Sequence, residues 1–221
     1  MEKEGTERKI RLTLVRHTSV DVAPGICYGH TDVPLKSTFP EEAATVKKCL
    51  DGKLFGRVFT SPLSRCVRLA GFCGYGDTAV RDNRLMEMDF GEWEMQRYDE
   101  IKDPRMQEWY EDYFNVPATG GESFADQRDR IISFLSQLSE EETGADGDIE
   151  DVLIFTHGGV ILQMMLLSGL VTLDNAFANQ PPYGGVVTMN LPRIKSSDHT
   201  AQRNFFERSR SFFDMSRLSG S

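Results

Sequence analysis

The sequence predicts an α/β fold in three layers, an α/β/α sandwich with helices on both faces of a mainly parallel sheet. Short apolar segments typical of strands alternate along the chain with longer segments of helical periodicity. The run "VLIF" at residues 152–155 is uninterrupted, as expected for a strand buried on both faces. With 221 residues, of which 39% are hydrophobic, the chain can bury a sizeable core.

The first half of the chain is expected to contain three strands and two helices. The strands are predicted at residues 10–15 ("IRLTLV"), 57–61 ("RVFTS") and 78–82 ("TAVRD"). The helices are predicted at residues 40–50 and 62–73. Pro40 and Pro62 suit the first turns of these helices, where a missing N–H has no intrahelical partner to lose. Residues 24–35, rich in Pro and Gly punctuation, are predicted to form a loop.

The second half begins with an excursion at about 85–121, which is mostly polar and aromatic and resembles a lid more than core. It is expected to hold one helix around residues 97–113. The remaining predicted elements are an amphipathic helix at 121–138, the strand at 152–155, a helix at 158–168 and a last strand at 184–191.

The predicted organisation is one domain over residues 1–195, including the excursion, followed by a C-terminal tail at 196–221. Residues 1–8 are charged and expected to fray, and residues 140–148 ("EEETGADGD") read as a solvated acidic linker. The tail carries Phe and Arg residues, which leaves a docked helix, a flexible tail and a partner-binding helix open.

Charge and composition exclude several classes of protein. The formal net charge of −9 and a pI of about 5.0 argue against nucleic-acid binding, which usually needs a basic stripe. There is no apolar signal core at the start and no apolar stretch as long as a membrane span, so we expect a soluble, cytoplasmic protein. The four cysteines form no CxxC pair, so buried reduced thiols are expected, and neither a zinc site nor disulfides.

Two of the predicted strands end on a histidine. Arg16 and His17 follow the first strand, and His157 follows the strand at 152–155. The carboxyl ends of parallel strands lie along one edge of a sheet, where ligands bind in α/β folds. We therefore expect His17 and His157, although far apart in sequence, to meet at one site.

Arg65 is predicted to lie in the first turn of the helix at 62–73. A cation there opposes the positive end of the helix dipole, so its usual interpretation is a surface residue. The position becomes favourable if an anion is held there by the helix N–H groups and the guanidinium together.

Glu87 is the candidate carboxylate of the site. Its neighbours Leu85, Met86, Met88 and Phe90 are apolar, and such surroundings would favour the neutral form that can donate a proton. A surface glutamate is the plain alternative. Glu92 and Glu94 are weaker candidates, which we expect to be helix-start charges or partners of arginines.

Four segments together resemble the signature segments of the histidine phosphatase superfamily, which has the phosphoglycerate-mutase-like fold. They are "LVRHT", "TSPLSRC", "LMEMDFGEWE" and "FTHGG", and they occur in that family's order and spacing. The similarity covers roughly residues 10 to 191. Within the superfamily, "GICYGHTDVPL" and "PATGGESF" are most similar to bacterial α-ribazole phosphatases, which act in cobalamin nucleotide-loop assembly.

The resemblance implies a role for each site residue. His17 would be the nucleophile and become a phosphohistidine, and Glu87 would be the proton donor. Arg16, Arg65 and His157 would hold the phosphoryl oxygens, without a metal or a cofactor. The chain departs from the family at Thr18, where the family usually has Gly, although a Thr hydroxyl can also bind phosphate.

Substrate binding is expected to involve the helix start at Gly158 and the segment "NQPPYGG" with Tyr183. Aromatic residues of the excursion could stack on a flat base or simply pack together. The predicted function is an α-ribazole 5′-phosphate phosphatase. Alternatives are a phosphoglycerate mutase, which the Phe90-Gly91 pair disfavours, and a silent module that binds phosphorylated ligands. A small phosphomonoester is the expected partner, and a homodimer remains open.

Overall fold

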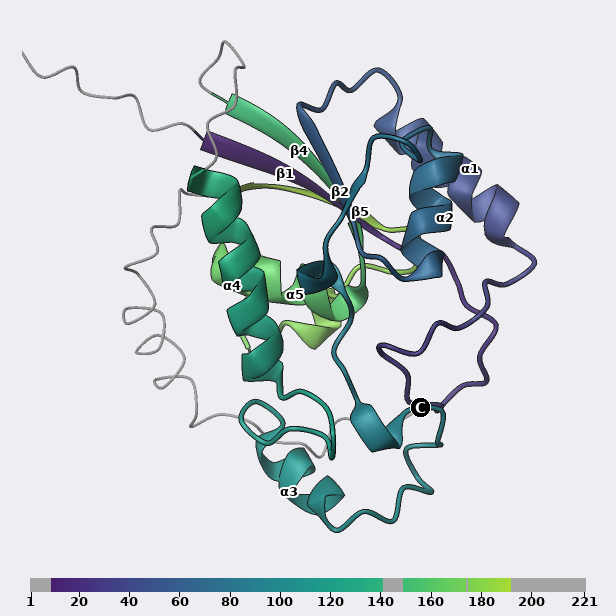
Figure 1. Cartoon of the computed structure of the whole chain (residues 1–221), viewed down its shortest axis with the longest axis vertical. Coiled ribbons are helices and arrows are strands. Elements are labelled where there is room, and N and C mark those ends of the chain that lie inside the picture. The colour runs from purple at the N-terminus through teal and green to yellow at the C-terminus, as the bar shows by residue number, and fades with distance from the viewer. Residues whose placement is uncertain (1–8, 141–148, 174, 192–221) are drawn as a thin grey trace, which may run out of the picture.

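The structure is a computed structural model that describes residues 9–140, 149–173 and 175–191 (Figure 1). The charged N-terminal segment, the acidic linker beyond Glu140 and the C-terminal tail of the sequence analysis lie outside the described residues.

A five-stranded sheet forms the centre of the fold. Its strands are β1 (Lys9–Arg16), β2 (Arg57–Thr60), β3 (Val80–Arg81), β4 (Ile149–Thr156) and β5 (Val186–Leu191). They lie in the order β3-β2-β4-β1-β5. β5 is antiparallel to β1, and the other pairs are parallel, so the prediction of a mainly parallel sheet is confirmed.

Helices cover both faces of this sheet (Figure 1). α1 (Phe39–Leu50) and α2 (Ser64–Phe72) pack on one face, and α4 (Phe124–Glu140) and α5 (Gly158–Leu167) pack on the other. The side chains of β4 alternate between the two resulting cores, and the run from Val152 to Phe155 is fully buried. The predicted three-layer sandwich is therefore confirmed.

The excursion contains less helix than its sequence predicts. α3 covers only Arg105–Asp112, and 3-10 turns lie at η1 (Asn83–Leu85) and η2 (Gly91–Trp93). Residues 97–104 are not helical because the chain there is held against the 24–35 loop. The Tyr98 N–H donates to Gly25 O at 2.9 Å, and Arg97 pairs with Ile26 in an antiparallel bridge.

A small separate core supports this contact between the excursion and the loop. Its buried members are Cys27, Trp93, Met106 and Ala118. Cys27 comes from the 24–35 loop and the other three from the excursion, so the two segments pack as one unit. The excursion therefore has a core of its own, beside the larger cores under the sheet.

Two further expectations are wrong in detail. α2 begins at Ser64 and not at Pro62, because Leu63 is still extended and the Asp32 carboxylate accepts the Ser64 N–H at 3.0 Å. Three of the four thiols are buried, as expected, but Cys49 is exposed on α1.

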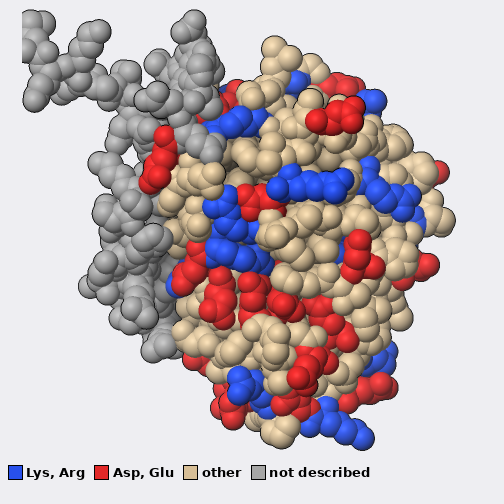
Figure 2. Space-filling view, viewed as in Figure 1, with Lys and Arg blue, Asp and Glu red and all other residues tan. Residues whose placement is uncertain are grey.

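The surface seen in Figure 2 carries charges of both signs. Basic side chains lie beside a group of acidic ones across the middle of this face. Neighbouring opposite charges partly cancel, so this face has no extended field of one sign.

Candidate active site

Two histidine rings meet at the carboxyl edge of the sheet. His17 follows β1 and His157 follows β4, and Arg16 is paired with Thr156 in the parallel register of those strands. The ring centroids are 5.2 Å apart, and the residues are 3% and 0% exposed. Adjacent parallel strands thus deliver both imidazoles to one buried place.

The tautomer of His17 is fixed by its own backbone. Nδ1 lies 2.8 Å from Thr18 O, and since a carbonyl oxygen can only accept, Nδ1 carries the proton. Burial lowers the pKa of His17 to about 3, and the Arg65 and Arg16 charges act in the same direction. The ring is therefore neutral at physiological pH, with its lone pair on Nε2.

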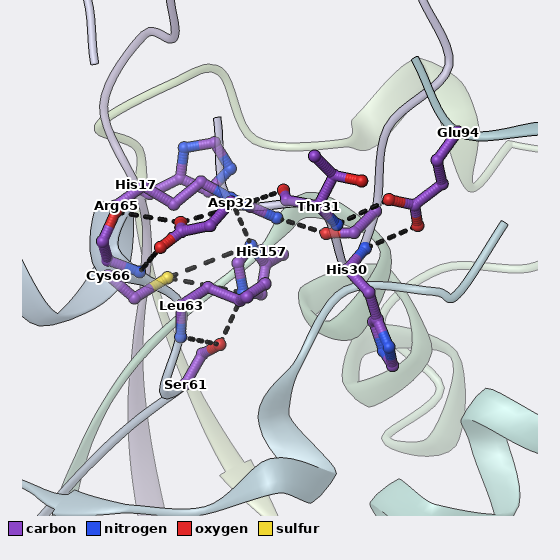
Figure 3. A network of polar contacts seen from close by, with 12 residues as sticks. His17, His30, Thr31, Asp32, Ser61, Leu63, Arg65, Cys66, Glu94 and His157 are labelled. Carbon is purple, nitrogen blue, oxygen red and sulfur yellow. Dashed lines mark hydrogen bonds and ion pairs between the residues drawn. The ribbon is translucent and has the colours of Figure 1, made fainter. Parts of the chain in front are cut away.

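His157 is neutral as well and carries its proton on the other nitrogen. Its Nδ1 accepts from Arg65 Nε at 3.3 Å, and Nε2 lies 2.7 Å from Ser61 Oγ (Figure 3). Burial, followed by the charge of Arg65, lowers the pKa of His157 well below its usual value. The structure therefore favours the neutral form of His157, which donates to Ser61.

Arg65 is fully buried and held by backbone carbonyls of the 24–35 loop. Nη1 donates to Thr31 O at 3.0 Å and Nη2 donates to Gly29 O at 2.6 Å. Together with Nε, these bonds use three of its five N–H groups, which leaves one N–H on each terminal nitrogen.

The anion expected at the start of α2 is supplied by the protein itself. Asp32 accepts from both the N–H and the hydroxyl of Ser64, at 3.0 and 2.9 Å. The expectation that α2 N–H groups help to hold an external anion is therefore wrong for Ser64. The same carboxylate lies 3.9 Å from Arg65, which helps to offset a buried cation at the positive helix end.

Arg16 and Thr18, on either side of His17, provide buried donors with no partner among the described residues. Arg16 donates from Nη1 to Pro181 O at 2.7 Å, but its Nε is buried and unpaired. The Thr18 hydroxyl is also buried and unpaired. Since buried polar groups are normally hydrogen-bonded, these two donors indicate a binding site for an oxygen-rich group beside His17.

Tyr183 lies against this site, together with a residue that the sequence analysis missed. The Arg16 guanidinium lies 4.1 Å from the Tyr183 ring centroid, and the His17 ring lies 5.5 Å from it. The Tyr183 hydroxyl is 2.7 Å from that of Tyr28, so the two phenols join the 24–35 loop to the segment that contains Tyr183. Tyr28 could have been suspected from the loop motif that contains it, "GICYGHTDVPL".

The aromatic residues of the excursion mostly pack against one another. Trp93 is 1% exposed and contacts Trp109 edge to face, and Trp109 also contacts Tyr113. Tyr98 packs against Phe90. Of the two alternatives that the sequence left open, packing therefore describes Trp93, Trp109, Tyr98 and Tyr113.

Glu87 lies at the start of α5 and is held by three N–H donors. Oε1 accepts from Met88 N and from Gln127 Nε2, and Oε2 accepts from Gly159 N, each at 3.0 Å. Gln127 was missed by the sequence analysis. Its place between Phe124 and Ile131 on the apolar face of α4 was the available signal, because a buried amide there needs a partner.

The two glycines that open α5 are tightly packed by protein groups. A Cβ at Gly158 would lie 2.4 Å from Gln180 Nε2, and one at Gly159 would lie 2.3 Å from Glu87 Oε1. The space at both Cβ positions is thus filled by protein side chains, and ligand binding at Gly158 stays a prediction. Glycine is needed so that Glu87, Gln180 and Arg16 can approach the backbone.

The described part of the chain contains no cluster of three or more His, Cys, Asp or Glu residues that could hold a metal ion. None of its helices has the length and apolar character needed to cross a membrane.

The fold and the site define an α/β enzyme of the phosphoglycerate-mutase-like type. The profile of the histidine phosphatase superfamily (branch 1) matches residues 12–194. The chain belongs to this superfamily, and it is a phosphatase.

Two of the similar proteins are described as phosphatases and one as a mutase. An adenosylcobalamin/alpha-ribazole phosphatase of Salmonella typhimurium is 32% identical over 174 residues, which cover 76% of this chain and 82% of the relative. A structure from Escherichia coli, described as a proposed alpha-ribazole-5′-P phosphatase, superposes with a TM-score of 0.71 and 25% identity, covering 83% of this chain and 91% of that one. A phosphoglycerate mutase structure from Thermus thermophilus has a TM-score of 0.64 and 27% identity, covering 83% and 94%.

Proposed function

We propose that this phosphatase hydrolyses phosphomonoesters without a metal, by transferring the phosphoryl group first to His17 and then to water. The observation that carries the proposal is the buried, neutral His17, whose Nδ1–H is fixed on Thr18 O so that the Nε2 lone pair is available. A neutral imidazole is a good nucleophile, and the charges of both Arg65 and Arg16 act on this ring.

The chemistry balances with the groups present. Nε2 of His17 forms a bond to phosphorus as the ester P–O bond breaks, and Glu87 gives its proton to the leaving oxygen. Glu87, now a carboxylate, takes a proton from water as that water attacks phosphorus and the P–N bond breaks. Arg16, Arg65 and the Thr18 hydroxyl donate to the phosphoryl oxygens throughout, which stabilises the charge of the transferring group.

We further propose α-ribazole 5′-phosphate as the substrate, in the nucleotide-loop assembly of cobalamin. The support is the 32% identity to the Salmonella typhimurium relative and the position of the "GICYGHTDVPL" segment. This segment supplies the carbonyls that hold Arg65 and the Tyr28 that bridges to Tyr183. The Tyr183 ring, which is 39% exposed beside Arg16, offers an aromatic surface on which a benzimidazole could stack.

Trapping the covalent intermediate tests the chemical proposal. With a 32P-labelled phosphomonoester and an alkaline quench, we expect label that is stable to alkali, labile to acid and mapped to His17, with or without EDTA. His17→Ala should lose both label and turnover. Cys49→Ala is the control, because that side chain is exposed on α1, and it should keep both. Label or near-normal turnover in His17→Ala would disprove the nucleophile.

A substrate panel tests the second part of the proposal. We expect kcat/KM for α-ribazole 5′-phosphate to exceed that for 3-phosphoglycerate and common nucleotides by at least about tenfold, since a site built for one alcohol discriminates against others. Conversion of 3-phosphoglycerate to 2-phosphoglycerate would instead indicate a mutase. Binding of phosphate esters without any turnover would indicate a silent binding module.

A further inference from the structure

Glu94 holds the backbone of two neighbouring segments with one carboxylate. Its Oε1 accepts from His30 N at 2.7 Å and from Phe90 N at 3.2 Å, and its Oε2 accepts from Thr31 N at 2.5 Å. Burial alone would raise the pKa of Glu94, but hydrogen bonds from Thr31 and His30 lower it below the ordinary value. Glu94 is therefore ionised at neutral pH, although it is only partly exposed.

This position differs from what the sequence indicated for Glu94. The residue follows the 3-10 turn η2 and does not begin a helix. Its three donors are main-chain N–H groups and not a guanidinium. Glu92, two residues earlier, is exposed and lies in the first turn of η2, as expected for a helix-start charge.

One of the peptide groups that Glu94 binds also binds Arg65. The N–H of His30 and the carbonyl of Gly29 belong to the same planar peptide unit, whose two ends cannot move independently. One end donates to Glu94 and the other accepts from Arg65 Nη2 at 2.6 Å. An anion at the N–H end also polarises the unit and strengthens its carbonyl as an acceptor for the guanidinium.

The connection continues into the centre of the site. Thr31, held by Glu94 through its N–H, accepts from Arg65 Nη1 through its carbonyl at 3.0 Å. Arg65 in turn donates from Nε to His157 Nδ1 at 3.3 Å. Figure 3 shows this row of contacts, from Glu94 at one side through Thr31 to Arg65 and His157.

The loop has little freedom to adopt another position. A Cβ at Gly29 would lie 1.7 Å from Met88 O, so its backbone is packed directly against the residue that follows Glu87. If the contacts to Glu94 are lost, the 29–31 backbone can shift only by leaving this surface. Such a shift carries the two carbonyl acceptors away from the guanidinium.

We infer that Glu94 is a positioning residue for Arg65, which binds the phosphate. Through the 29–31 backbone, Glu94 fixes the orientation of the Arg65 guanidinium and, through Arg65, that of the His157 ring. The inference rests on the proposed function, in which Arg65 binds the phosphoryl oxygens. Glu94 itself does not touch the substrate.

Glu94→Gln is the first test. The amide keeps the shape of the side chain but turns an NH2 group toward backbone N–H donors. Part of the set of hydrogen bonds that Glu94 accepts is therefore lost. We expect kcat/KM to fall about 10- to 100-fold, because a small misplacement of a binding group has effects of this order. The inhibition constant of inorganic phosphate should rise by at least about fivefold, as expected for the loss of one good contact. Glu92→Gln is the matched control and should stay within about twofold of wild type.

A double-mutant cycle separates positioning from general structural damage. If Glu94 acts through Arg65, Glu94→Gln should change kcat/KM by no more than about twofold in an Arg65→Ala background, because no guanidinium remains to be positioned. Losses that multiply across the two variants, or no loss in Glu94→Gln alone, would overturn the inference. If Glu94→Gln does not fold, Glu94→Asp, which keeps the charge but shortens its reach, enters the same cycle.

Failure of this inference and failure of the proposed function are distinguishable. Absence of label on His17 would count against the covalent mechanism, whatever the cycle shows. Label on His17 together with independent effects of Glu94 and Arg65 would reject only the positioning role.

Discussion

At the scale of single residues, the neutrality of two histidines is the main feature of the site. Burial disfavours imidazolium at His17 and His157, and Arg65 adds unfavourable charge to both. Each ring then has one hydrogen-bond acceptor for its single N–H, Thr18 O for His17 and Ser61 Oγ for His157. The cations that would bind a phosphate thus also keep the nucleophile deprotonated.

Glu87→Gln should discriminate between substrates by their leaving groups. The amide fills the same space but cannot give a proton to the departing oxygen. We expect turnover of an alkyl phosphate to fall about 10²- to 10⁴-fold, the usual range for acid–base help. p-Nitrophenyl phosphate, whose leaving group needs no proton, should slow far less. Steady-state rates with both esters provide the measurement, and equal slowing would contradict Glu87 as the acid.

At the scale of elements, the first turn of α5 binds the side chain of Glu87, the proposed acid. The Gly159 N–H is one of the unpaired donors of the first helical turn, and it donates to Glu87 Oε2 at 3.0 Å. Gln127, on the neighbouring α4, and the Met88 N–H are the other two donors to Glu87. Two helices and one loop therefore fix the position of the Glu87 carboxyl group.

Gly159→Ala should disturb the hydrogen bonds that hold Glu87 without unfolding the protein. The new Cβ would lie 2.3 Å from Glu87 Oε1, which is the end of a flexible side chain and can move aside. We expect kcat to fall about 10- to 100-fold with the fold intact, because the acid is displaced by about 1 Å.

The control for this variant is Gly71→Ala in α2, where nothing lies within 4 Å of the new Cβ. It should leave kcat unchanged and stabilise the protein by about 0.5–1 kcal/mol, as alanine does in helices. Kinetics and urea unfolding of both variants provide the measurement. An active Gly159→Ala enzyme would show that the contact with Glu87 is dispensable.

At the scale of the whole molecule, the buried histidines link stability to pH. An unfolded histidine titrates near 6.5, whereas the pKa of folded His17 is about 3. Between these values the unfolded chain binds a proton that folded His17 does not. Stability contributed by this residue therefore falls as the pH drops below 6.5, and His157 acts in the same direction.

The expected slope below pH 6.5 is about 1.4 kcal/mol per pH unit for each such histidine. Urea unfolding at pH 7.5, 6.5 and 5.5 gives the slope for wild type, and His17→Gln should show a smaller one because its side chain does not titrate. Identical slopes in the two proteins would show that folded His17 takes up a proton in the same range as the unfolded chain.

The sequence by itself determined the layers of the fold and the place of the site. The uninterrupted run from Val152 to Phe155 required a strand buried on both faces, and helices between strands required a mainly parallel sheet. A parallel sheet places His17 and His157 at the same edge, and the adjacency of β1 and β4 in the structure brings their rings to 5.2 Å. These features depend on local periodicity and chain direction, which can be read directly from the sequence.

Only the tertiary structure decided what each side chain binds. Several contacts join segments that are distant in the chain: Asp32 with Ser64, Gln127 with Glu87, Tyr28 with Tyr183, and Glu94 with the backbone of His30. The helix expected at 97–113 was shortened because residues 97 and 98 bind the 24–35 loop. Such contacts depend on distances in the folded chain, and local preference carries no information about them.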